Sequence, residues 1–196
     1  MKTKILISLA LFAILIISCN KIRYWYYELT EVDKQIIPYE LGQTVSFIDS
    51  EGYPFILTVQ QDTTYLIADR LSGSNIYKMI GRRVVKLQSE SLIISLAVEG
   101  YSPDDRYNTI DVFISIVELG TSLYYGIRYD KKGEFLGSGI HNSMDINGKV
   151  YYDVVECNTS KDVNGQPTIP TQLFYNKTYG ILQINRDGEN FLTINE

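Results

Sequence analysis

The chain is poor in the residues that build metal sites and disulfide scaffolds. It has two cysteines and one histidine among 196 residues. Two cysteines exclude a disulfide-rich scaffold and a four-cysteine zinc site, and one histidine excludes a multi-histidine metal centre. We therefore expect neither a metal ion nor another cofactor.

Positive charge is also scarce. The chain carries 18 Lys and Arg residues against 23 Asp and Glu residues, which gives a formal net charge of −5. Because proteins that bind nucleic acid cluster Lys and Arg against the phosphates, a nucleic-acid partner is not expected. Hydrophobic residues make up 45% of the chain and charged residues 21%, as in folded proteins, and the length favours a single domain.

One long apolar run lies near the N-terminus. Lys2 and Lys4 precede the run from Ile5 to Ile17, whose only polar residue is Ser8. The run is too short to cross a bilayer, which takes about 18–20 apolar residues. A basic start followed by a short apolar run predicts a signal peptide over residues 1–18.

The end of the apolar run carries a further motif, Ile16-Ile17-Ser18-Cys19. This motif resembles the lipobox of bacterial lipoproteins. The resemblance implies that the chain is cut before Cys19, that the Cys19 thiol is diacylated and that the new amino terminus is acylated. Because several acyl chains anchor a protein stably where one does not, the membrane is an expected partner. An ordinary signal peptide and a buried N-terminal helix are the alternatives.

The residues after Cys19 bear on the compartment. Asn20 stands where enteric lipoproteins retained in the inner membrane have Asp. The stretch Asn20–Arg23 also lacks the acidic cluster seen in many surface-exported Bacteroidota lipoproteins. We therefore expect a cell-envelope protein that is lipid-anchored in the outer membrane and faces the periplasm.

Residues 19–40 are expected to form the lipid-anchored N-terminal segment. Tyr24-Trp25-Tyr26-Tyr27 begins five residues after Cys19, at most about 17–18 Å of extended chain away. We interpret this run as a first strand with half of its aromatic side chains in the core. The alternative is that the run lies on the lipid headgroups, since Tyr and Trp favour the membrane interface.

Residues 41–196 show the period-two pattern of antiparallel β-strands. Apolar and more polar residues alternate over Phe55–Gln60, Leu92–Glu99 and Ile110–Val117, and each run has one fully apolar face. We expect a single all-β domain, either an antiparallel sandwich or an open half-barrel, and the pattern does not separate these from a lipocalin-like barrel. Asp62–Arg70 fits a strand, whereas Leu71–Gly81 is predicted as a loop or a short helical turn.

Turn residues separate the strand runs, and Asn147-Gly148 and Asp187-Gly188 are clear examples. A two-residue loop at Asp187-Gly188 would mix polar and apolar residues on both faces of the last hairpin. A three-residue loop, Arg186–Gly188, instead places four apolar residues on one face: Leu182, Ile184, Leu192 and Ile194. We predict the three-residue loop.

Two stretches near the C-terminus carry a second resemblance. They run from Ile146 to Val155 and from Leu173 to Leu182, and the second is followed by Asp187-Gly188. Together they resemble the C-terminal part of small Bacteroidota lipoproteins, in which a Gly-Lys-x-Tyr-x-x-Val strand precedes a Tyr-x-x-x-x-Gly-Ile strand and a closing hairpin. The resemblance implies a β-rich envelope protein and no particular activity.

Few residues suggest catalysis. His141 lies in a Gly-, Ser- and Asn-rich stretch without a nucleophile-elbow motif and is expected to be a loop residue. Asp104-Asp105 is expected to form a solvated turn rather than a calcium site. Cys157, left alone once Cys19 is acylated, is expected to be a buried, inert thiol. We therefore predict no catalytic residues.

Three residues are candidates for modification or binding. Thr63 lies in Asp62-Thr63-Thr64, which resembles the sequon for O-glycosylation of exported Bacteroidota proteins. Tyr124 and Tyr152 belong to Tyr-Tyr pairs that place one ring on each face of a strand. Both are candidates for a Tyr-lined site that binds a sugar or a protein.

The sequence as a whole favours a lipid-anchored envelope protein that acts as a non-enzymatic binding or interaction module for a protein or a glycan. A carrier that holds an apolar ligand in a β-cleft is the alternative, and a hydrolase is the third interpretation. A carrier requires an apolar concave pocket, a glycan binder requires exposed tyrosines, and an enzyme requires converging acids or a paired His141.

Overall fold

The computed structural model describes residues 22–70, 73–100, 109–118, 121–130, 132–161 and 167–195. These residues form one twelve-stranded sheet that does not close, and 71% of them lie in strands, which confirms the expected all-β fold. Within them, no helix is long and apolar enough to span a membrane. The elements are β1 (Arg23–Tyr27), α2 (Glu31–Lys34), β2 (Thr44–Asp49), β3 (Pro54–Arg70), β4 (Ile76–Gln88), β5 (Leu92–Glu99), β6 (Thr109–Glu118), β7 (Thr121–Asp130), β8 (Ile140–Ile146), β9 (Lys149–Lys161), β10 (Pro167–Asn176), β11 (Gly180–Arg186) and β12 (Glu189–Ile194).

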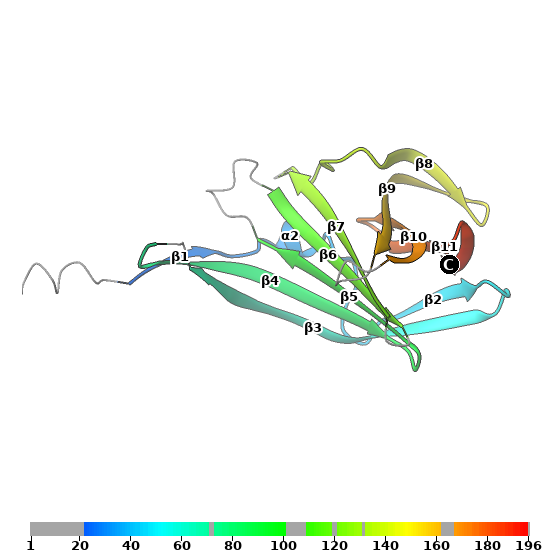
Figure 1. Ribbon diagram of the computed structural model, residues 1–196, viewed down its shortest axis with the longest axis horizontal. Coiled ribbons are helices and arrows are strands. Elements are labelled where there is room, and N and C mark those ends of the chain that lie inside the picture. Colours follow the sequence, from blue (N-terminus) through cyan, green and yellow to red (C-terminus); the bar gives the residue numbers. More distant parts are fainter. Residues whose placement is uncertain are drawn as a thin grey trace, which may run out of the picture.

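The strand order in the sheet is β7-β6-β5-β4-β3-β2-β12-β11-β10-β9-β8, and β1 lies off this path, parallel to β4. Strands β2 to β7 follow one another from the middle of the sheet to one edge. Strands β8 to β12 follow one another from the other edge back to the middle, where β12 pairs with β2. The sheet curls, as twisted sheets do, so that β7 comes close to β9 (Figure 1). An ion pair between Glu118 of β6 and Arg186 of β11 joins the two halves.

The hydrophobic core lies inside the curled sheet. The apolar residues of the alternating runs point into it, as predicted. Side chains at most 4% exposed include Leu92, Ile94, Leu96 and Val98 of β5 and Ile110, Val112, Ile114 and Ile116 of β6. Burying one such side chain stabilises the fold by about 1.5–3 kcal/mol. The period-two pattern therefore decides which face of the sheet turns inward.

The last hairpin, β11 and β12, combines the two registers considered above. Asp187 and Gly188 have positive φ angles of 51° and 82° and form a two-residue turn, so the predicted three-residue loop is wrong. A bulge after Ile184 then shifts the register by one residue. Ile184 consequently lies opposite Leu192, and the four apolar residues share the buried face as predicted.

Three strands continue beyond the curl as a projection that we name the arm. The arm consists of β1, Tyr65–Arg70 of β3 and Ile76–Gly81 of β4. Figure 1 shows it extending away from the rest of the sheet, with the start of β1 at its far end. Residues 76–81 are thus strand, and the predicted loop or helical turn is wrong for them. Gly73, at a φ of 75°, provides the turn before β4.

β1 is a strand, as predicted, but its first three aromatic side chains do not enter the core. Tyr24, Trp25 and Tyr26 are 51%, 39% and 59% exposed. The reason is the pairing of β1, which adds to the arm part of β4 and not to the curled part that encloses the core. The prediction that half of these aromatic side chains are buried is therefore wrong.

Candidate binding pocket beneath the N-terminal strap

The segment Leu29–Leu41, which we name the strap, connects β1 to β2 and contains α2. The Thr30 side chain accepts a hydrogen bond from the Asp33 backbone N–H, and the Asp33 carboxylate accepts one from the Thr30 N–H. This capping box fixes a single helical turn that would not be stable in isolation. The strap also contributes four side chains to the core: Leu29, Ile36, Ile37 and Tyr39.

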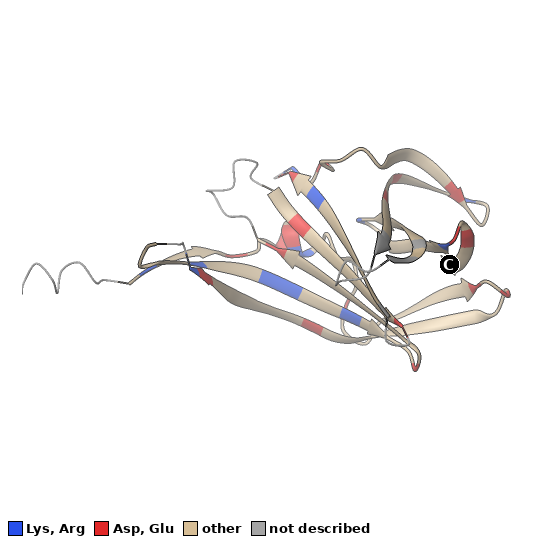
Figure 2. Cartoon of the chain, viewed as in Figure 1, with Lys and Arg blue, Asp and Glu red and all other residues tan. Residues whose placement is uncertain are grey.

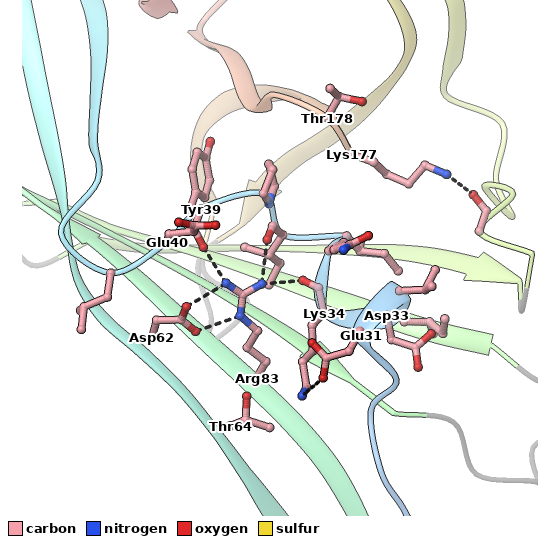
Figure 3. A pocket seen from close by; sticks show the side chains of 18 of the residues that line it. Glu31, Asp33, Lys34, Tyr39, Glu40, Asp62, Thr64, Arg83, Lys177 and Thr178 are labelled. Atoms are coloured by element: carbon pink, nitrogen blue, oxygen red, sulfur yellow. Dashed lines mark hydrogen bonds and ion pairs between the residues drawn. The ribbon is translucent and has the colours of Figure 1, made fainter.

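Arg83 of β4 binds the strap to the sheet. Its guanidinium donates hydrogen bonds of 2.5, 2.8 and 2.6 Å to the carbonyl oxygens of Lys34, Ile37 and Tyr39. It also donates bonds of 2.8 and 2.9 Å to the two carboxylate oxygens of Asp62 in β3 (Figure 3). These five bonds use all five N–H donors of the side chain. Arg83 is therefore a structural clamp and has no donor left for a ligand.

Two tyrosines attach the other side of the strap to β10 and β11. The Tyr39 hydroxyl accepts a hydrogen bond of 2.6 Å from the Ile181 N–H, and the Tyr175 hydroxyl donates one to the Ile36 carbonyl. Gly180 has a φ of 80°, and a Cβ at this position would overlap the Tyr39 hydroxyl. Glycine is thus needed both for the backbone angle and for the close approach. Burial raises the pKa of Tyr39, so its hydroxyl stays protonated.

A pocket of about 1110 Å³ opens beside the strap. Lys177, in the turn after β10, donates a hydrogen bond of 2.6 Å to the Gly133 carbonyl in the loop after β7, which joins two of the pocket walls (Figure 3). The Lys177 ammonium also lies 5.6 Å from the centroid of the Tyr129 ring. Besides the strap, the walls contain Asp62, Thr64, Arg83, Ile110, Lys132, Gly133, Lys177 and Thr178.

The pocket is lined by charges of both signs, and several of them are paired. Glu31 and Lys34 form an ion pair at 2.7 Å, and Arg83 is paired as described. Glu40, Lys132 and two threonine hydroxyls are further polar groups on the walls. Such a lining can bind a polar ligand through hydrogen bonds. Nowhere in the described ranges do three or more metal-binding side chains come together.

His141 lies in β8, so its prediction as a loop residue is wrong, and it does not line the pocket. Its Nε2 is 2.8 Å from Oε2 of Glu156 in β9, and its ring centroid is 6.2 Å from that of Phe174. Glu156 also accepts hydrogen bonds from Asn158 and Gln172. The bonds from Asn158 and His141 lower the pKa of the Glu156 carboxyl. His141 therefore has the carboxylate partner that the hydrolase interpretation requires, but the pair lies outside the pocket and belongs to a polar network that crosses three strands.

Tyr124 lies in β7, 47% exposed, and stacks on Phe113 of β6 with 5.8 Å between ring centroids. Burial, and next the Glu99 carboxylate, raise the pKa of Tyr124. A row of charged residues crosses β4 to β7 near this pair: Arg82, Glu99, Asp111 and Arg128. A ring face offers contact to the CH groups of a sugar, and neighbouring carboxylates accept hydrogen bonds from its hydroxyls.

The other candidate residues lie apart from one another. Tyr152 is 66% exposed in β9, in the other half of the sheet from Tyr124. Thr63 is exposed in β3, and its hydroxyl accepts a hydrogen bond of 3.0 Å from Gln61. Its glycosylation stays a prediction. Cys19, the expected lipid attachment site, lies outside the described residues.

The remaining cysteine, Cys157, is in β9 and packs against the core, but it is half-buried and not buried as predicted. Burial raises the pKa of its thiol to about 11. The thiol is therefore protonated near neutral pH, as expected of an inert cysteine. Asp104-Asp105, predicted as a solvated turn, lies outside the described residues.

The strap and its clamp were not found from the sequence. Arg83 has no motif around it, and its four partner residues come from two separate segments, so no local pattern points to it. The Thr-x-x-Asp spacing of Thr30 and Asp33, however, is a helix-start signal that predicts α2. No family model, no curated protein and no solved structure matches the chain.

Proposed function

We propose that the protein is a non-enzymatic binding module, held in the cell envelope by a lipid on Cys19, whose ligand binds in the pocket beside the strap. One observation carries this proposal. β1 begins four residues after Cys19, and the strap that follows β1 forms a wall of the pocket. The anchor and the binding site therefore belong to one continuous stretch of chain.

The arm separates the pocket from the membrane in this proposal. Arg70 lies near the end of the arm and Thr64 lines the pocket, and the six residue steps of strand from one to the other span roughly 20 Å. A pocket at that height is clear of the lipid headgroups. It is accessible to molecules of the periplasm, the compartment that the sequence predicts.

The lining of the pocket favours a polar ligand, of the protein or glycan class, over an apolar one. The hydroxyls, and those charged groups that are not already paired within the protein, supply hydrogen bonds to a ligand. An apolar ligand would displace their water without replacing its hydrogen bonds, at a cost of about 1–3 kcal/mol each. The inward face of the sheet is occupied by the protein's own side chains. Both facts weigh against a carrier of apolar ligands.

The anchor is tested by Cys19→Ala in the full chain. We expect this variant to lose its acyl groups and to leave the membrane fraction, because a signal sequence alone does not anchor a mature protein. Fractionation and intact mass measure the two effects. A variant that stays in the membrane until detergent is added would contradict the proposal.

The pocket is tested by titrating the purified protein with defined oligosaccharides and with extended peptides of mixed charge. We expect binding from one of these sets and its loss in Thr178→Trp, where the indole fills the pocket. Tyr53→Ala, a change on an exposed ring that does not line the pocket, is the matched control and should bind normally. No binding from either set would contradict the proposal.

A second candidate surface is the ring pair of Tyr124 and Phe113 with its row of charged residues, which would bind a sugar. The observation in favour of this surface is that the exposed ring of Tyr124 lies near the carboxylates of Glu99 and Asp111. Sugar binding that is lost in Tyr124→Ala and kept in Thr178→Trp would assign the ligand to this surface instead of the pocket.

A further inference from the structure

The arm concentrates exposed aromatic residues at its N-terminal end. Ile22 is 54% exposed, and the exposed residues Tyr24, Trp25 and Tyr26 follow after Arg23. Tyr77 of β4 stacks on Tyr24 with 5.7 Å between ring centroids. These side chains form a cluster that the core of the protein does not cover.

The cluster occupies both faces of the arm. Because successive strand residues point to opposite faces, Tyr24 and Tyr26 lie on one side and Trp25 on the other. A protein that docked on one face would leave the other rings in water. A lipid layer that the arm enters end-on covers the rings on both faces at once, and Tyr and Trp are the residues that favour that layer.

The charge at the end of the arm has the sign that suits lipid phosphates. Asp69 lies opposite Lys78 in the register, and the other charged residues in the described part of this end are Arg23 and Arg70. Blue segments mark this end of the arm in Figure 2. Arg70 also lies 5.9 Å from the centroid of the Tyr77 ring. The end of the arm is thus positive in a chain whose net charge is −5.

The length of chain before the arm limits where the cluster can lie. Arg23 is four residues from Cys19, at most about 14 Å of extended chain. The headgroup layer is roughly 5–8 Å thick on each side of the bilayer. A lipid on Cys19 therefore keeps the cluster within or just above the headgroups.

We propose that the end of the arm, Ile22–Tyr26 with Arg70 and Tyr77, inserts its aromatic rings into the headgroup layer of the membrane that holds the lipid. This inference rests on the proposed lipid anchor at Cys19. The contact makes the arm a fixed support, so that the pocket is held at a set height and orientation instead of moving on a tether.

The sole tryptophan of the chain, Trp25, lies in the cluster and reports on it directly. The full chain, purified from membranes with its lipid, is reconstituted into vesicles of phosphatidylethanolamine and phosphatidylglycerol. Part of the lipid carries bromine, a quencher, on the upper acyl chain. We expect a blue shift of the Trp25 emission on reconstitution and quenching by the brominated lipid.

The matched control moves the tryptophan to the body of the protein. The double variant Trp25→Phe, Tyr152→Trp places it at an exposed position of β9, and we expect neither the shift nor the quenching. Flotation of the vesicles is measured in parallel. Protein that floats with the vesicles but has unquenched Trp25 emission would overturn the arm contact and leave the lipid anchor intact. Protein that does not float would overturn the proposed anchor itself, and the arm contact with it.

Discussion

The two halves of β4 lie in different surroundings. In the half that belongs to the curled sheet, Val85 and Leu87 are fully buried and alternate with half-exposed residues. In the half that belongs to the arm, Ile76, Tyr77, Met79 and Ile80 are all partly exposed, so neither face has a buried row. The same strand is therefore core on one side of Arg83 and surface on the other.

The difference shows what each region depends on. The curled sheet excludes water from one face, and the strap closes it at one end through Arg83 and Tyr39. The arm is stabilised by backbone pairing and by ring contacts such as that between Tyr24 and Tyr77. Isolated strand pairs are marginal in water, so such an arm gains from contact with a further surface.

The largest effect is expected at the boundary between the two regions. Arg83→Met removes five hydrogen bonds and leaves Asp62 as a shielded carboxylate without its cation. Breaking a buried pair in this way lowers the free energy of unfolding by about 3–5 kcal/mol. Urea unfolding followed by circular dichroism measures it.

The control for this prediction is the neighbouring residue on the opposite face. Arg82 pairs with Glu99 at 3.3 Å, and about a third of its side chain is exposed. Arg82→Met should therefore cost less than about 1 kcal/mol. Equal losses from the two variants would show that the strap is not held by Arg83.

The next effect concerns the contact between the strap and β11. Gly180→Ala forces the Tyr39 ring away and breaks its hydrogen bond to Ile181, and alanine also strains at a φ of 80°. We expect a loss of about 2–4 kcal/mol in the free energy of unfolding. Gly148→Ala is the matched control, because Gly148 has a φ of 79° and open space around it. It should cost only about 1–2 kcal/mol.

The next prediction concerns the reactivity of the Cys157 thiol, which lies in the curled sheet. With a pKa of about 11, the Cys157 thiol should react with a disulfide reagent on the order of 100-fold more slowly in the folded than in the unfolded protein near neutral pH. A second thiol that reacts fast in the folded protein would be an unacylated Cys19, and would contradict the anchor.

The raised pKa of Cys157 also makes the free energy of unfolding depend on pH, and its direction fixes the sign of that dependence. Because the folded state favours the protonated thiol, Cys157 supports stability fully below its unfolded pKa of about 8.5. That support is lost as the pH rises toward the folded pKa of about 11. Cys157→Ser removes this dependence, which urea unfolding over the alkaline range can measure.

The curled sheet and two strands of the arm, β1 and the end of β3, could be predicted from the sequence. The arm part of β4 and the attachment of the strap to the sheet could not. In Leu92–Glu99, apolar and more polar residues alternate because one face of the strand is buried. Eight consecutive residues are enough to show this pattern. Apolar and polar residues do not alternate in residues 76–81, because both faces of this part of β4 are partly exposed. The strand was therefore not predicted. The Arg83 clamp depends on partners 21 to 49 residues away, which no local spacing reveals.

The smallest effect is expected from aromatic residues of the arm. Tyr26→Ser in the detergent-solubilised protein should change the free energy of unfolding by less than about 0.5 kcal/mol, because Tyr26 is exposed and lies outside the core. Tyr151→Ser is the same substitution in the curled sheet, where the ring is buried and packs edge-on against Tyr179 at 5.2 Å. It should cost about 3–5 kcal/mol. If the two variants lost equal stability in urea unfolding, the arm would be packed within the protein, and its rings would not be free to enter a lipid layer.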